Sequence, residues 1–125
     1  MRLNPADNID SALEYIKETV GDEKVEVTLI NGMNPSRISR TDCTEWDKVA
    51  SAVASTWRGC IVSPYLMVQC SDSRHWGRIS DRVYRFSAMD LTSEERASIH
   101  GNNEKIRLDA LARSNEFYIR LMKKC

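Results

Sequence analysis

The apolar positions near the N-terminus recur every three or four residues, which is the spacing of one face of an α-helix. In residues 8–21 this face consists of Ile9, Leu13, Ile16 and Val20. Asn8 or Asp10 can accept a hydrogen bond from a backbone N–H at the helix start, and Gly21 is placed to end the helix. The pattern therefore predicts an amphipathic helix between these signals.

Two further segments show the same helical spacing. Residues 41–57 predict a second helix, which Thr41 or Asp42 can cap, and its apolar face comprises Trp46, Val49, Ala50, Val53 and Trp57. Residues 109–125 predict the last helix, with two lysines near the negative end of its dipole. Its expected apolar stripe comprises Leu108, Leu111, Ala112, Asn115, Tyr118, Ile119 and Met122.

Three segments are typical of β-strands. Residues 24–30 alternate and contain β-branched side chains, residues 60–69 form a nearly continuous apolar run, and residues 82–87 form a short third strand. Pro64 indicates an edge or a break in the second strand, because proline has no N–H to donate to a ladder.

Short helical turns fill much of the remaining chain. Residues 71–79 predict a cap followed by a short helix, and residues 90–98 predict a helical turn that Thr92 or Ser93 caps. Helices and strands thus alternate along the chain. This order predicts the α/β class, with a mixed sheet packed by helices.

The composition is that of an ordinary globular domain, with 42% hydrophobic and 29% charged residues among 125. The 18 basic and 18 acidic residues cancel, which argues against nucleic acid as a partner. No apolar run approaches the roughly 18 residues that span a bilayer, and the N-terminus lacks the pattern of a secretory signal. The four cysteines form no Cys-x-x-Cys pair, so we expect reduced thiols and a cytoplasmic location.

His100 is the first candidate for chemistry. Its neighbours favour a surface turn in which Gly101 adopts a positive φ, because no His-x-Glu or His-Glu-x-x-His partner stands beside it. The alternative is that the imidazole is a working group. The nearby acidic pair, Glu94 and Glu95, is interpreted as a solvated helix end without a catalytic role.

Two other places could bind an anion or a carbonyl group. Ser71 and Asp72 either cap a short helix in the ordinary way or leave backbone N–H groups available for a ligand. Arg2 has the bidentate guanidinium that suits a carboxylate, or it is a solvated charge near the terminus. The local pattern favours the ordinary interpretation at both places.

Several motifs in order resemble a known family. The chain contains, in sequence, SPYL, SDSRHW, ISDRVYRF, IHGNNEKI and EFYIRLM. This order resembles the C-terminal part of the zinc-dependent aminoacylase/carboxypeptidase family, in particular its Gly-X carboxypeptidase (carboxypeptidase S) and N-acyl amino acid hydrolase branch. Upstream, RLNPADNIDSALEYI resembles the end of that family's lid or dimerisation domain, and NPSRISRTDCTEWDKVASAV resembles the return into its catalytic domain. The resemblance implies a lid remnant in residues 1–30 and part of a catalytic domain in residues 31–125.

The resemblance implies a metal role for His100. It matches the family's last metal ligand, an imidazole on one of two zinc ions, and Asn103 and Glu104 match the loop that supports this ligand. The other family ligands are a His-x-Asp pair, a bridging Asp, a Glu-Glu pair whose first member is the general base, and a further carboxylate. No His-x-Asp pair stands in this sequence, and its one Glu-Glu pair, Glu94 and Glu95, is given no catalytic role. We therefore expect weak or no zinc binding and no hydrolysis by these residues alone.

The resemblance also implies substrate contacts. Arg2 matches an arginine of the lid domain that grips the carboxylate of the substrate. Ser71 and Asp72 match a Thr-Asp turn beside the substrate, with serine in place of threonine. Cys70 stands where small residues, often glycine, are common in the family, which puts the tightness of this turn in question.

The predicted function is that of a C-terminal fragment of a zinc-dependent hydrolase that cleaves peptide or N-acyl amide bonds beside a free carboxylate. The expected partners are the missing N-terminal catalytic half and a small peptide or N-acyl amino acid substrate, with neither nucleic acid nor membrane. The alternative is a non-catalytic binding or structural module, or a subunit that associates with another chain. Unpaired strand edges would favour such association, a homo-oligomer included.

Overall fold

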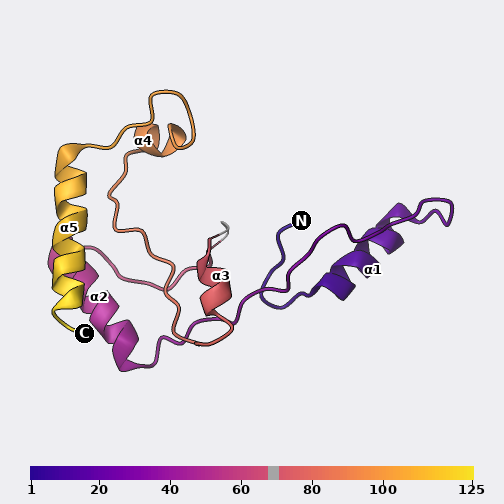
Figure 1. Ribbon diagram of the computed structural model, residues 1–125, viewed down its shortest axis with the longest axis horizontal. Helices are drawn as coiled ribbons and strands as arrows, with labels where there is room; N and C mark the ends of the chain where they lie inside the picture. The colour runs from indigo at the N-terminus through magenta and orange to yellow at the C-terminus, as the bar shows by residue number, and fades with distance from the viewer. Residues whose placement is uncertain (68–70) are drawn as a thin grey trace. The chain divides into compact units, whose positions relative to one another are not determined.

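The computed structural model describes residues 1–67 and 71–125, in which five α-helices are joined by irregular and extended segments (Figure 1). The helices are α1 (Ile9–Val20), α2 (Thr44–Thr56), α3 (Ser73–Trp76), α4 (Ser93–Ala97) and α5 (Leu108–Met122). All five lie where the sequence predicts helices or helical turns. None of the described helices is long and apolar enough to cross a membrane.

The expected α/β class is wrong, because the described residues are helical and contain no strand or sheet. Residues 24–30, 60–67 and 82–87 have irregular backbone where strands were predicted, and the end of the second predicted strand lies outside the described residues. A strand exists only where a second segment accepts its ladder hydrogen bonds. Residues 61–67 form no backbone-to-backbone hydrogen bond within the described part. Side chains that favour a strand cannot form one without a partner.

The chain forms two compact units, and each is described by itself. Unit 1 consists of Met1–Ser39 and Leu66–Val83 and contains α1 and α3. Unit 2 consists of Arg40–Tyr65 and Tyr84–Cys125 and contains α2, α4 and α5. The division expected after residue 30, between a lid remnant and a catalytic part, stays a prediction.

Helix α1 of unit 1 begins and ends at the predicted signals. The Asn8 side chain accepts a hydrogen bond from the Ser11 N–H at 2.9 Å, and Ser11 Oγ accepts one from the Asn8 N–H at 3.1 Å. This reciprocal capping box satisfies donors that the first turn leaves unpaired. At the other end, Gly21 has φ +60°, a left-handed conformation that glycine adopts without strain. The Ile9 N–H donates to Asn34 Oδ1 at 2.9 Å, which ties a later segment to the helix start.

Replacing Gly21 tests the end of α1. A Cβ at this position would lie 3.6 Å from the carbonyl oxygen of Glu18, so backbone conformation and not crowding sets the cost. We expect Gly21→Ala to destabilise the helix by about 1 kcal/mol. Gly21→Asn should cost less, because asparagine tolerates left-handed backbone. Thermal unfolding followed by circular dichroism measures both, and equal losses would contradict this account.

Helices α2 and α5 lie side by side and form the core of unit 2 (Figure 1). The buried apolar residues of this core are Ala52, Val53, Ala88 and Phe117. Around Phe117, the ring centroids of Trp57 and Phe86 lie at 5.8 Å and 5.1 Å. This aromatic cluster joins the end of α2 to α5 and holds the segment before α4 against both helices.

The start of α2 differs from the prediction. Cys43 occupies the N-cap position, and its side chain makes no capping hydrogen bond. Asp42, one of the two predicted caps, pairs with the Arg40 guanidinium at 2.9 Å instead. The hydrogen bond from Arg40 is the main reason that the pKa of Asp42 lies below its ordinary value. The carboxylate of Asp42 is therefore engaged by Arg40 and does not cap α2.

Helix α5 packs with a different face from the predicted one. Its buried residues are Ala110, Ser114 and Phe117, and Leu121 packs against the same core. The predicted stripe is exposed at every position, namely Leu108, Leu111, Ala112, Asn115, Tyr118, Ile119 and Met122. The helix carries apolar side chains on both faces, and α2 packs where small residues allow the helices to approach closely. Periodicity alone could not decide between these faces.

Two truncations on α5 test which face is buried. Phe117 is 1% exposed, so Phe117→Ala should remove about 3–5 kcal/mol of stability by creating a cavity in the core. Leu111 is 46% exposed, and Leu111→Ala should change stability by less than about 0.5 kcal/mol. Urea unfolding followed by tryptophan fluorescence gives both values. A larger loss for Leu111→Ala would show that the predicted stripe is the buried face.

Candidate functional site

The loop between α4 and α5 carries three of the predicted site residues. His100 is exposed, and its backbone N–H donates to Glu104 Oε2 at 3.1 Å. Its imidazole makes no hydrogen bond with the described residues. Asn103 lies in the same turn and is also exposed. Glu104 thus supports the backbone of His100, and the ring stays accessible to a ligand.

The loop backbone is left-handed at two residues that are not glycine. His100 has φ 64° and Asn103 has φ 62°, a left-handed region that is uncommon for residues other than glycine and that Asn and His enter more readily than most. The expectation that Gly101 supplies the positive φ is therefore wrong. Glycine suits position 101 for a different reason, because a Cβ there would lie only 3.1 Å from the carbonyl oxygen of Ser98. Its N–H donates to that same oxygen at 2.9 Å, which turns the chain tightly at the end of α4.

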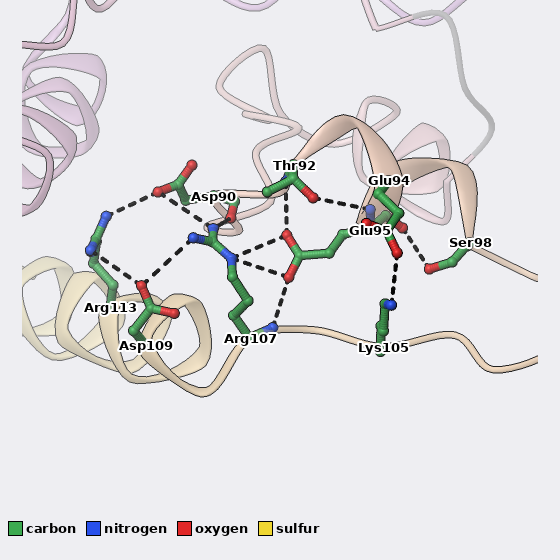
Figure 2. A network of polar contacts seen from close by, with 9 residues as sticks. All are labelled: Asp90, Thr92, Glu94, Glu95, Ser98, Lys105, Arg107, Asp109 and Arg113. Carbon is green, nitrogen blue, oxygen red and sulfur yellow. Dashed lines mark hydrogen bonds and ion pairs between the residues drawn. The ribbon is translucent and has the colours of Figure 1, made fainter.

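The carboxylate of Glu95 lies at the base of this loop (Figure 2). Glu95 is only 4% exposed, so the interpretation of the Glu94 and Glu95 pair as a solvated helix end is wrong for Glu95. Its Oε2 accepts a hydrogen bond from the Thr92 N–H at 2.8 Å, and Thr92 Oγ1 accepts one from the Glu95 N–H at 3.2 Å. This capping box starts α4. The other oxygen, Oε1, accepts the Arg107 N–H at 2.8 Å, directly before α5.

The side chain of Arg107 completes this contact. Its Nε lies 3.2 Å from Glu95 Oε1 and 3.3 Å from Oε2, and its Nη2 donates to the Asp90 carbonyl oxygen at 2.6 Å. Figure 2 shows that Arg113 extends the network, with Asp90 at 2.9 Å and Asp109 at 3.7 Å. Charge-assisted bonds around one buried carboxylate therefore connect the segment before α4 to the first turns of α5.

A second ion pair lies on the exposed side of the same loop. Lys105 Nζ donates to Glu94 Oε1 at 2.8 Å, and this hydrogen bond raises the pKa of Lys105 above its ordinary value. The Glu94 side chain is 79% exposed, and an ion pair in water contributes little to stability. The buried neighbour, Glu95, is therefore the more important contact for the loop.

The pKa of Glu95 lies below its ordinary value, mainly because the Thr92 N–H donates to the charged carboxylate. Burial of the carboxyl acts in the opposite direction, and the N–H and the positive charge of Arg107 lower the pKa further. A carboxyl whose pKa falls on folding stabilises the folded chain above its unfolded pKa. This stabilisation is lost as the pH falls through the folded pKa.

Acid unfolding tests this linkage. Between neutral pH and the ordinary carboxyl value of 4.5, the contribution of Glu95 should be fully present, and it should decline as the pH falls below that value. Glu95→Gln should therefore lower the melting temperature near pH 7 and flatten its decline below pH 4.5. Circular dichroism melts from pH 7 to pH 3 measure this, with Glu94→Gln as the exposed control. A parallel acid decline in wild type and Glu95→Gln would contradict it.

The predicted substrate turn lies in unit 1, at the start of α3. Ser71 stands one residue before the N-cap, and its hydroxyl accepts the Ser73 N–H at 3.1 Å in a local turn. Asp72 occupies the N-cap position and makes no side-chain capping bond. Cys70, whose effect on this turn was in question, lies outside the described residues. Arg2 is also in unit 1 and is exposed.

The predicted site residues are thus distributed over both units. Unit 2 brings together the three loop residues, His100, Asn103 and Glu104. Unit 1 contains the three residues expected to bind substrate, Arg2, Ser71 and Asp72. The substrate roles of these three residues stay predictions.

Glu95 and Arg107 are the site residues that the sequence did not indicate. A signal for Glu95 was present, since Thr92 followed three residues later by glutamate is the spacing of a capping box. Arg107 gave no local signal, because it meets Glu95 twelve positions away along the chain. Only the path of the loop brings the two together.

The described residues contain no group of three or more His, Cys, Asp or Glu side chains that could hold a metal ion. A zinc site takes three or four protein ligands. His100 is exposed and its ring is not engaged by the described residues, so it fits one position of such a site. The residues that the structure describes therefore fit a single zinc ligand and not a complete site.

The chain is similar to several curated proteins along almost its whole length. It is 32% identical over 122 residues to the "N-fatty-acyl-amino acid synthase/hydrolase PM20D1" of Xenopus tropicalis, covering 97% of this chain and 24% of the frog protein. It is 26% identical to the human protein of the same name, over 97% of this chain and 25% of that protein. The "Probable carboxypeptidase S-like 2" of Dictyostelium discoideum is 23% identical, over 98% and 24% of the two chains.

The chain spans about a quarter of the length of these relatives. No family model matches it, and no solved structure matches it with significance. The names of these relatives are those of the groups that the ordered motifs of the sequence resemble. The resemblance is therefore confirmed.

Proposed function

Because this chain is homologous to the PM20D1 and carboxypeptidase S-like proteins of the M20 family, we propose that it contributes to zinc-dependent hydrolysis of an N-acyl amide or peptide bond beside a free carboxylate. The observation that carries this proposal is the match over 97% of the chain to a protein named as a synthase/hydrolase of N-fatty-acyl amino acids. A cytoplasmic location is part of the same proposal.

The proposal assigns His100 to one zinc ligand. Its exposed imidazole, presented on a loop whose backbone is held by Glu104 and Glu95, supports this role. A bound zinc ion would supply Lewis acidity and a water of lowered pKa. Arg2 would bind the substrate carboxylate through its planar pair of N–H donors, and the turn at Ser71 and Asp72 would lie beside the substrate.

The chain would act together with a segment equivalent to the remaining three quarters of its relatives. The described residues contain no second set of metal ligands beside His100, so the other ligands and the general base would come from that segment. Exposed apolar side chains support the need for a partner. Ile61 is 94% exposed, and Tyr65 and the outer face of α5 are also open to solvent.

The same exposed face of α5 favours a second candidate function, a non-catalytic module that binds another chain. Leu111, Tyr118, Ile119 and Met122 are apolar side chains of α5 that the described part of unit 2 leaves between 44% and 67% exposed. A binding module would use this surface whether or not His100 meets a metal. The two functions therefore differ in their dependence on His100.

A fusion protein separates these functions. This chain would replace the matching quarter of the Xenopus tropicalis relative, and hydrolysis of an N-fatty-acyl amino acid would be measured. We expect activity in the fusion and none in the isolated chain. His100→Ala should lower kcat/KM in the fusion by more than about 100-fold, because loss of a metal ligand exceeds the effect of losing its supports.

The chain offers a matched control, because His75 is its one other histidine. His75 is exposed on α3, and His75→Ala should leave zinc binding by the fusion unchanged in isothermal titration calorimetry. Equal zinc affinity in the unmodified fusion and the His100→Ala fusion would contradict the proposed metal role. Tight, stoichiometric zinc binding by the isolated chain would contradict the need for a complementing segment.

A further inference from the structure

We propose that Glu95 and Arg107 are positioning residues for His100, which act by fixing both ends of the loop that carries it. The inference rests on the proposed function, because positioning has a chemical purpose only if His100 is a ligand. It concerns residues that make no contact with the imidazole, so it assigns them no catalytic role.

Both ends of the loop meet at Glu95. At the first end, Ser98 Oγ donates to the Glu95 carbonyl oxygen at 2.7 Å. At the second end, the Arg107 N–H donates to the Glu95 carboxylate at 2.8 Å. Residues 99–106 are therefore a closed loop whose two ends are bonded to one buried residue, as in a compact surface loop with adjacent ends.

The anchor is rigid because its groups have little freedom. Glu95 is 4% exposed and binds Thr92 and Arg107 through both carboxylate oxygens. The guanidinium of Arg107 is bonded on one side to Glu95 and on the other to the Asp90 carbonyl (Figure 2). Rotation of the Glu95 side chain would break its bonds to the Thr92 and Arg107 N–H groups at the same time, and rotation of Arg107 would remove the positive charge from a buried carboxylate.

The loop itself requires such an anchor. The left-handed backbone of His100 and Asn103 is one of several conformations that an unanchored loop could adopt. The bond from the His100 N–H to Glu104 joins two loop residues to each other and not to a helix. The direction of a side chain follows from the dihedral angles of its backbone. Loss of the bonds between Glu95 and Arg107 would therefore change the direction in which the His100 imidazole points.

A purely structural role for Glu95, as the cap of α4, is the competing explanation. That role predicts a loss of stability and a fraying of α4, with no specific effect on a metal bound elsewhere. The positioning role predicts in addition a change at the metal ion. Two measurements, one on the isolated chain and one on the fusion, distinguish these possibilities.

The first measurement is amide hydrogen exchange in the 125-residue chain. Glu95→Gln keeps the shape of the side chain and removes its charge, and Glu94→Gln is the matched control on the adjacent exposed residue. We expect Glu95→Gln to speed exchange at the His100 and Arg107 amides at least tenfold, with amides of α2 unchanged. Glu94→Gln should leave all of them within about twofold. Unchanged exchange in Glu95→Gln would overturn the inference, without reference to any metal.

The second measurement is zinc affinity of the fusion with the Xenopus tropicalis segment, determined by competition with a chelator. Groups that orient a metal ligand typically contribute about 10- to 100-fold to metal affinity, and we expect such a loss in Glu95→Gln and in Arg107→Lys. Arg107→Lys keeps the backbone bond to Glu95, which guards against a variant that fails to fold. Cobalt in place of zinc should show a shifted visible spectrum in both variants, which a loss of stability alone would not produce.

The outcomes separate the inference from the function on which it rests. If His100→Ala leaves zinc affinity unchanged, the proposed function fails. If His100→Ala lowers the affinity while Glu95→Gln and Arg107→Lys do not, the function stands and the positioning role is wrong. A tenfold or greater loss in all three variants, with the cobalt spectrum altered, supports both.

Discussion

The buried charge of Glu95 constrains the whole second half of unit 2. A carboxylate that leaves water must recover its hydration through hydrogen bonds and opposite charge, and Glu95 does so through Thr92 and Arg107. These partners lie on opposite sides of the His100 loop along the chain. The start of α4, the start of α5 and the closure of the loop therefore depend on the contacts of one buried carboxylate.

The apolar surface of the chain follows from a second constraint, the small number of segments available to cover it. Phe117 and its neighbours form one modest core between α2 and α5. Ile61, Tyr65 and the outer residues of α5 remain exposed, although their apolar character suits burial. The relatives are about four times as long as this chain. Under the proposed function, a segment equivalent to their remaining length would cover these surfaces and supply the metal ligands that the described residues lack.

The site shows how far prediction from sequence reaches. His100 was assigned a metal role because ordered motifs resembled a known family, whereas its immediate neighbours favoured a simple turn. Its left-handed backbone and its bond to Glu104 were not foreseen. Glu95 was interpreted as a solvated residue because an acidic pair at a helix end is usually solvated, and its burial depends on Arg107, a partner that no local pattern indicates.

The sequence by itself determined where the helices lie and how α1 begins and ends, because caps and helical periodicity are local properties. It also established the similarity to the relatives, because the order of motifs is a property of the sequence alone. Only the tertiary structure decided which face of α5 is buried, that the three apolar segments form no strands within the described residues, and that Glu95 closes the His100 loop. Each of these depends on a partner distant along the chain, and local periodicity carries no information about that partner.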